Sequence, residues 1–278
     1  MNGQSNKPQS WSQRAPGDPV LSGVNWGGLK TLYIKEVRRF FKVQMQTVWA
    51  PAITTLLYLV IFTVALGRTG RTVLGVPFAD FIAPGLIMMA MLQNAFANAS
   101  FSLLVGKMQG TIVDYLMPPL STGELIAGLV GAAVTRAILV GCAVWLVMVP
   151  WPGVHVAVTH PLSLIWFGLM GSLMLALMGL LTSIWASKFD HSAVVTNFVV
   201  APLSLLSGTF YAVDQLSPAF SAASHANPFF YIISGFRHGF LGASDSPLWI
   251  GAIGLLAINV ALYAACYALI RAGWKIKN

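Results

Sequence analysis

The chain has 278 residues, of which 56% are hydrophobic and only 9% are charged, and its formal net charge is +8. Soluble globular domains contain about 25% charged residues, so this composition excludes most soluble enzymes and binding proteins. The high apolar content excludes a disordered chain, and the presence of only two cysteines excludes a disulfide scaffold. The composition therefore predicts an integral membrane protein, and its basic excess indicates no nucleic-acid partner.

Charged residues are unfavourable in lipid, so the charge-free stretches of the sequence locate the membrane spans. About 20 residues cross the hydrocarbon core, and the longest stretch, 137–187, holds two spans because turn residues break it at 149–153. The segments are too long for a β-barrel and do not alternate, so we expect an all-α fold. Six transmembrane helices are predicted, at 47–67, 81–105, 124–149, 162–186, 193–212 and 248–270.

The distribution of Lys and Arg predicts the orientation in the membrane. An even number of spans places both termini on one side, and twelve of the sixteen cations fall on that side. These are Lys7, Arg14, Lys30, Lys35, Arg38, Arg39, Lys42, Lys107, Lys188, Arg271, Lys275 and Lys277, against Arg68, Arg71 and Arg237 on the other side. Both termini are therefore predicted to be cytoplasmic. Residues 1–25 lack a signal-peptide core and are expected to form a disordered tail, and 271–278 form a second tail.

Residues 26–46 form an amphipathic stretch before the first span. Apolar side chains fill one arc of this helix, and Lys35, Arg38, Arg39 and Lys42 fill the other. The stretch fits an interfacial anchor and equally a lever that joins the spans to a cytoplasmic partner. Glu36 projects from the apolar arc, so its carboxylate needs a partner, whose identity the sequence leaves open.

The cytoplasmic loop 107–122 contains a short predicted helix over Thr111–Met117. Two prolines end it, and Ser121 with Glu124 matches a capping box that starts the next span. This apolar knob either tucks into the bilayer surface or docks a soluble partner. The candidate docking residues are Thr111, Ile112, Asp114, Tyr115, Leu116, Met117, Pro118 and Pro119.

The last loop, 213–247, faces outward and is rich in aromatic residues rather than hydrophilic. Pro218 and Pro228 are typical first residues of helices, so we expect two short helices that re-enter the outer leaflet.

Two arginines need an explanation because they lie in apolar surroundings. Arg237, in the outer loop, either extends to the headgroups or pairs with Asp214 or Asp245. Arg136 lies twelve residues beyond Glu124, roughly 18 Å along the helix axis. An intramembrane charge indicates a functional site, and a structural ion pair is an equal alternative.

Six polar residues inside the second and fifth spans are candidates for a substrate path, although such residues more often hold helices together. They are Gln93, Asn94, Asn98, Asn197, Ser204 and Ser207.

Several kinds of chemistry have no motif in this sequence. No Gly-x-x-x-x-Gly-Lys-Ser/Thr phosphate loop occurs, because Met108 follows Gly106-Lys107. No His, Cys or Glu cluster has metal-ligand spacing, so no metal and no cofactor is expected in this chain. An intramembrane serine protease is disfavoured, since Ser244 lacks the trailing glycine of a nucleophile elbow.

The arrangement over residues 24–275 resembles the membrane permease of bacterial type-2 ABC exporters, near the lipo-oligosaccharide and drug exporters. Asp114 to Glu124 resembles the coupling-helix region of that family, and Ala212 stands where the family often has proline. The segments that carry the resemblance most specifically are Leu206–Phe210, Leu216–Pro218, Asn227–Tyr231 and Gly235–Gly242.

The resemblance implies an assembly in the bacterial inner membrane of two copies of this permease with two copies of a cytoplasmic ATPase, which would hold ATP and magnesium. The 111–119 knob would be the coupling helix, and the 26–42 helix the connecting helix. Spans two and five would line the path. The outer gate would include Phe210, Asn227, Pro228, Tyr231 and Arg237.

The nearly uncharged path favours an amphipathic or lipid-linked cargo, such as a drug, lipid or glycolipid. The alternatives are a secondary transporter driven by an ion gradient and a membrane-embedded enzyme or scaffold without an ATPase. A secondary transporter normally has carboxylates near the middle of its spans, and no acidic residue of this sequence falls there.

Overall fold

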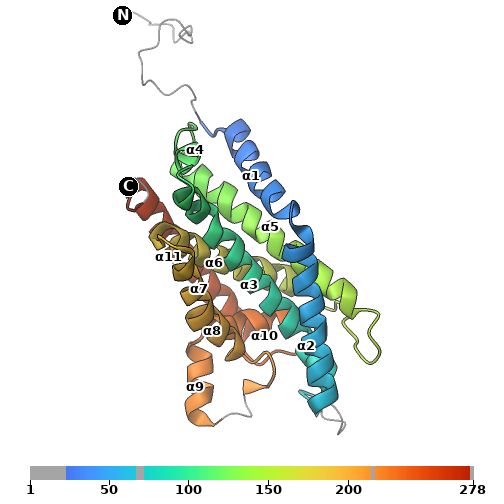
Figure 1. Ribbon diagram of the computed structural model, residues 1–278. Helices are drawn as coiled ribbons and strands as arrows, with labels where there is room; N and C mark the ends of the chain where they lie inside the picture. Colours follow the sequence, from blue (N-terminus) through green and yellow to red (C-terminus); the bar gives the residue numbers. More distant parts are fainter. Residues whose placement is uncertain (1–22, 67–71, 214–216, 276–278) are drawn as a thin grey trace, which may run out of the picture.

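The computed structural model describes residues 23–66, 72–213 and 217–275, and these are almost entirely helical (Figure 1). The predicted disordered tail therefore lies mostly outside the described residues, as do Asp214, Arg68 and Arg71. A hairpin of two strands, β1 (Thr72–Val73) and β2 (Val76–Pro77), each two residues long, precedes helix α3. The helices are α1 (Trp26–Phe41), η2 (Met45–Trp49, a π-helix), α2 (Ala50–Leu66), α3 (Phe78–Met108), α4 (Val113–Leu116), α5 (Thr122–Met148), α6 (Pro161–Trp185), α7 (Phe189–Val195), η3 (Thr196–Val200, a π-helix), α8 (Ala201–Leu205), α9 (Pro218–Ala226), α10 (Pro228–Leu241) and α11 (Leu248–Ala272).

Among the described residues, five helices are long and apolar enough to cross a membrane. They are Met45–Ala65, Phe78–Met108, Thr122–Met148, Pro161–Trp185 and Leu248–Ala272. The helix predicted over 193–212 differs from these. It is built from α7, η3 and α8 and ends at Leu205, because the chain turns through Gly208 with a φ of 74°. The fold is thus an all-α membrane fold, and the count of six spans is not confirmed.

Helix α3 lies at the centre of the bundle and is buried along nearly its whole length. It packs against α5, α6 and α10, whereas α2 and α11 expose most of their surface. Helix α1 does not stand apart at the surface, because it packs along α5 and places Leu32 against Gly128 (Figure 1). The segment for which the sequence left open an interfacial anchor or a lever therefore packs along the bundle.

The outer loop contains the two helices expected from its prolines. Helix α9 begins at Pro218, and α10 begins at Pro228. The side chain of Asn227 caps α10 by accepting a hydrogen bond from the backbone of Phe229 at 3.0 Å. Helix α10 packs against α3 and α6, so this loop closes one end of the bundle (Figure 1).

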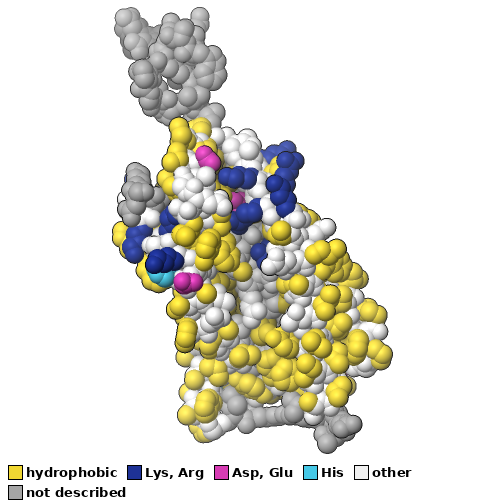
Figure 2. All heavy atoms as spheres, viewed as in Figure 1, with side chains coloured by type: hydrophobic (Ala, Val, Ile, Leu, Met, Phe, Trp, Pro, Cys, Tyr) yellow, Lys and Arg dark blue, Asp and Glu magenta, His cyan; other side chains and the backbone are white. Residues whose placement is uncertain are grey.

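The two ends of the molecule differ in charge. Figure 2 shows Lys and Arg side chains gathered in the half of the molecule that holds α1 and α4, while hydrophobic and uncharged atoms make up the other half of this face. Helix α11 finishes at the same end at which α1 begins (Figure 1). Most cations of the described residues thus lie at one end of the bundle, and the predicted orientation would place this end in the cytoplasm.

Helices α3 and α6 approach each other closely at Gly179, and this contact gives a test of the packing. A Cβ atom there would lie 2.5 Å from the carbonyl oxygen of Phe96 and 3.0 Å from the Cβ of Ala99. The backbone of α3 cannot move away from an added Cβ atom as a flexible side chain could. We therefore expect Gly179→Ala to destabilise the protein by about 1–3 kcal/mol, measured as the melting temperature of detergent-purified protein.

The matched control is Gly254→Ala on α11, where an added Cβ would meet nothing within 4 Å. Alanine favours helix over glycine, so this variant should be at least as stable as the wild type. Equal effects of the two substitutions would contradict the α3–α6 contact.

Candidate functional site

The most polar buried site of the described residues lies where α1, α4 and the cationic end of α3 meet. Glu36 of α1 is 0% exposed. Its Oε1 accepts a hydrogen bond from the Tyr115 hydroxyl at 3.0 Å, and its Oε2 accepts one from the Ser102 hydroxyl at 3.2 Å. The Nη2 atom of Arg39, one helical turn away, lies 2.9 Å from Oε2. Glu36 thus has the partner that the sequence required, and the cation is Arg39.

Arg39 extends the same set of contacts onto α3. Its Nη2 donates to the backbone oxygen of Asn98 at 2.9 Å and to the Ser102 hydroxyl at 3.1 Å. Hydrogen bonds to ionised groups are about twice as strong as neutral ones, and a buried network reinforces its members. We call Glu36, Arg39, Asn98, Ser102 and Tyr115 the Glu36 network. It joins α1 to residues of α3 and α4 that lie 59 to 79 positions further along the chain.

Tyr115 differs from the sequence prediction, which placed it on an exposed apolar knob. Only Val113–Leu116 is helical, and Tyr115 is buried with the ammonium nitrogen of Lys35 3.9 Å from its ring centroid. Burial and the charge of Glu36 raise the pKa of the Tyr115 phenol, so it stays protonated and donates to the carboxylate. The knob prediction is therefore wrong for Tyr115.

The rest of the short helix points the other way. Met117 is 79% exposed, and Leu116 and Val113 are also exposed. Of the remaining candidate docking residues, Thr111, Asp114, Pro118 and Pro119 are exposed, and Ile112 is partly buried. Helix α4 therefore presents apolar atoms on its outer side while Tyr115 fixes its inner side to α1.

The far end of this loop is also joined to α1. The predicted capping box is present, because Ser121 Oγ accepts from the Glu124 backbone at 3.3 Å and Glu124 Oε2 accepts from the Ser121 backbone at 2.7 Å. The second carboxylate oxygen of Glu124 accepts from the backbone of Asn25 at 2.6 Å. The Asn25 amide donates to the Pro119 oxygen at 3.2 Å. The 109–121 loop is thus joined to α1 at Tyr115, in its middle, and to the N-cap residue of α1 at its far end.

At the opposite end of the molecule, Arg237 of α10 is 1% exposed. Its Nη1 lies 2.7 Å from Asp245 Oδ2, its Nη2 donates to the Gly208 oxygen at 2.6 Å, and its guanidinium carbon lies 3.8 Å from the Phe81 ring centroid. Of the partners considered from the sequence, Asp245 is the one found, and extension to the headgroups is excluded. The contacts join α10, the Gly208 turn and the start of α3.

The other residues predicted for the outer gate lie on α10, at its start, and beside the Gly208 turn. The amide of Asn227 donates to the Leu203 oxygen at 2.8 Å, which connects the start of α10 to α8. The Phe210 ring packs on Phe62 of α2 at 4.4 Å between centroids. Tyr231 is partly exposed on α10, next to Phe230.

The six predicted path residues are not gathered on one surface of this chain. Asn94 and Asn98 are buried on α3 and contact arginines, while Gln93 is partly exposed. In and just after the segment α7–α8, Ser204 and Ser207 are buried and donate to backbone oxygens of the same segment. Ser204 donates to the oxygen of Val200, and Ser207 donates to that of Ser204. Asn197 is exposed.

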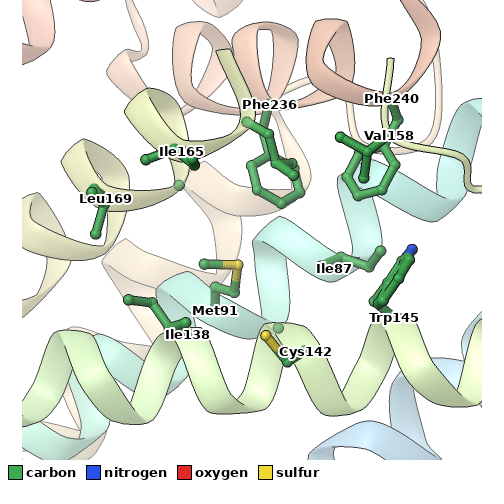
Figure 3. Close-up of a pocket in the computed structure, with 13 residues that line it drawn as sticks. Ile87, Met91, Ile138, Cys142, Trp145, Val158, Ile165, Leu169, Phe236 and Phe240 are labelled. Atoms are coloured by element: carbon green, nitrogen blue, oxygen red, sulfur yellow. The ribbon is translucent and has the colours of Figure 1, made fainter. Parts of the chain in front are cut away.

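A cavity of about 490 Å³ lies between α3, α5, α6 and α10, and the sequence did not predict it. Its lining is apolar, with Met91 and Phe236 buried behind it and Ile138, Trp145 and Ile165 exposed at its rim. Figure 3 shows Cys142 on α5 turned toward this space. None of the predicted path residues lines the cavity.

Comparison with known proteins identifies the family. The model of the ABC-2 type transporter family matches residues 28–241, which is most of the chain. The chain belongs to the ABC-2 type transporter family. It is 39% identical over 257 residues to the inner membrane transport permease YadH of Escherichia coli (strain K12), across 91% of this chain and 98% of that protein. It is 25% identical over 256 residues to Nodulation protein J of Rhizobium leguminosarum bv. viciae, across 90% and 95%.

The chain is therefore a multi-pass transport permease of the bacterial inner membrane, as its resemblance indicated. In the sequence of this ABC-2 permease, the only indication of the Glu36 network was the position of Glu36 itself on the apolar arc of the amphipathic helix. Ser102 carried no sequence signal. It is an ordinary serine in a long apolar helix, and only the packing of α1 on α3 brings it to the carboxylate.

The Glu36 network predicts a large loss of stability when its carboxylate is removed. Glu36→Ala would leave Arg39 without its counter-charge and Tyr115 without its acceptor. Breaking a buried ion pair from one side destabilises a protein by about 3 kcal/mol or more, although Arg39 is partly exposed and water will reduce the effect. The melting temperature in detergent measures it.

Asp114→Ala is the control, because it removes the same charge from an exposed position of α4. Exposed charges contribute little, so this variant should melt with the wild type. Equal melting temperatures for Glu36→Ala and Asp114→Ala would contradict the structural role of the network.

Proposed function

We propose that this ABC-2 permease is the transmembrane subunit of an ATP-driven exporter. Two copies form the path, two copies of a separate cytoplasmic ATPase drive it, and both termini are cytoplasmic. The observation that carries the proposal is the construction of the 109–121 loop. Its exposed side is apolar, around Met117, while its inner side is fixed through Tyr115 to α1 and α3.

The proposed mechanism follows from that construction. The ATPase binds the exposed atoms of α4, and its ATP-dependent closure displaces the 109–121 loop. Because Tyr115 and Glu36 bind each other and Ser102 binds the same carboxylate, α1 and α3 follow the loop. Lys35, Arg38 and Lys42 are exposed on α1 and contact the ATPase beside it.

At the outer end, the proposed gate consists of α9, α10 and the Gly208 turn. Arg237 connects α10 to that turn and to Asp245, so opening requires these contacts to move together or to break. Residues on α3 and α7–α8, among them Gln93 and Asn197, face the path between the two copies.

The cargo is proposed to be amphipathic or lipid-linked. The cavity between α3, α5, α6 and α10 accepts an apolar group, and its rim opens on the exposed flank of α5 and α6. The alternative of a gradient-driven transporter has less support. The described carboxylates of Asp80, Glu124 and Asp245 lie at helix ends or outside the spans, not near their centres.

The docking role predicts that a charge at Met117 will uncouple the two subunits. With the cognate ATPase co-purified in lipid, Met117→Asp should lower permease-stimulated ATP hydrolysis and transport about tenfold, because the carboxylate would be buried in an apolar contact. Met117→Leu keeps the apolar surface and should retain activity. The spans should fold equally well in both variants, checked by size-exclusion chromatography. Full hydrolysis and transport by Met117→Asp would sink the docking role.

The apolar cavity offers a chemical test of the cargo. Cys142 is exposed at the cavity and Cys266 is buried, so a bulky apolar maleimide should modify Cys142 selectively. Modification should strongly reduce export of an amphipathic cargo, and the Cys142→Ala permease should be insensitive to the reagent. Unchanged export after complete modification would exclude this cavity from the cargo route.

A further inference from the structure

Arg136 of α5 has a charge that the described part of the chain does not neutralise. Its Nη2 donates to Asn94 Oδ1 at 2.7 Å, an amide oxygen without formal charge. Its Nε is buried without an acceptor, and no carboxylate of the described residues lies within ion-pair distance. The Nε of Arg237 also has no acceptor in the described structure, but the charge of Arg237 is paired with Asp245, and that of Arg39 is paired with Glu36.

The neighbouring groups add donors rather than acceptors. Asn94 and Asn98 are four residues apart on α3, so they lie on one face, about 6 Å apart along the axis. Arg136 binds the first and Arg39 binds the second. The Nδ2 of Asn98 is also buried with no acceptor in the described structure. Two guanidinium groups and an amide N–H thus gather between α1, α3 and α5, against the one carboxylate of Glu36.

The length of α3 places this cluster near the inner edge of the hydrocarbon. Helix α3 has 31 residues, about 46 Å, whereas the hydrocarbon core is about 30 Å thick. The excess lies at the polar end that holds Ser102 and Lys107. A span that starts at Phe78 leaves the hydrocarbon near residue 98, so Asn94 and Arg136 lie about one turn inside it, within reach of a lipid headgroup.

We propose that Arg136, with Asn98 and the partly exposed Arg39, binds the phosphate of a lipid anchored in the inner leaflet. A phosphate supplies the missing negative charge and several acceptor oxygens, and a guanidinium fork binds it with two hydrogen bonds. Basic pockets between transmembrane helices on the cytoplasmic side bind anionic headgroups for the same reason. The site goes beyond the proposed function, since it needs neither the ATPase nor ATP.

The test uses the purified full-length permease and two lipids with identical acyl chains, phosphatidylglycerol and diacylglycerol. Binding is measured by native mass spectrometry and by the shift in melting temperature. The wild type should bind phosphatidylglycerol and not diacylglycerol, and Arg136→Gln should weaken that binding about tenfold. Arg38→Gln, which removes an exposed cation from α1, should change it less than about twofold. Arg136→Lys keeps the positive charge but loses the paired N–H donors of the guanidinium, so its affinity for phosphatidylglycerol should lie between those of the wild type and Arg136→Gln. This variant replaces Arg136→Gln in the comparison if Arg136→Gln does not fold.

The same binding measurements are then made with a polyprenyl phosphate, because a lipid-linked cargo would present the same phosphate on a different hydrocarbon anchor. Tighter binding of either lipid supports the site and identifies the anchor it takes. Equal binding of phosphatidylglycerol and diacylglycerol, or equal losses in Arg136→Gln and Arg38→Gln, would overturn the proposal. Because these measurements omit the ATPase, such a result would leave the exporter function to its own test at Met117.

Discussion

The buried carboxylate of Glu36 is the constraint on which the cationic end of this permease depends. A charge without solvent exposure is strongly unfavourable unless it is paired and hydrogen-bonded. Three donors from three segments meet that requirement, namely Arg39 of α1, Ser102 of α3 and Tyr115 of α4. Any displacement of α4 relative to α1 or α3 would remove at least one of them. Helix α4 is therefore mechanically continuous with the central span of the bundle.

The two ends of the bundle differ in whether the chain provides a counter-charge for a buried arginine. Arg237 is enclosed by Asp245, the Gly208 carbonyl and the Phe81 ring, so its charge is satisfied within the chain. Arg136 has only an amide oxygen among the described residues. The end of the bundle that holds α9 and α10 is thereby joined within the chain, while the end that holds α1 and α4 keeps a cation that an anionic headgroup can satisfy. This asymmetry agrees with the lipid phosphate site that we propose.

The general fold could be predicted from the sequence, because charge in lipid is so unfavourable that charge-free stretches mark the spans. The same reasoning misplaced the end of the segment predicted over 193–212, since a gap in charge does not indicate the turn at Gly208 after the helix ends at Leu205. The capping box and the helix starts at Pro218 and Pro228 were predictable because each depends on residues adjacent in sequence.

The site was only partly predictable because it depends on packing. The need of Glu36 for a partner followed from its place on an apolar arc, but the choice of Arg39 and Tyr115 depends on how α1 lies against α3 and α4. The inward orientation of Tyr115 could not be read from a four-residue helix, which is too short for periodicity to define a face. The cavity near Cys142 likewise arises from four helices distant in sequence.

The most direct test of the account is a double-mutant cycle between Glu36→Gln and Tyr115→Phe, read out as permease-stimulated ATP hydrolysis. Each substitution weakens or removes the hydrogen bond between α1 and α4 while keeping the shape of the side chain. If the Glu36 network transmits motion, each single variant should lose stimulation and the double variant should lose little more, with a coupling energy of about 1 kcal/mol. Additive effects, or full stimulation in the double variant, would contradict the claim that this network couples the docking helix to the membrane spans.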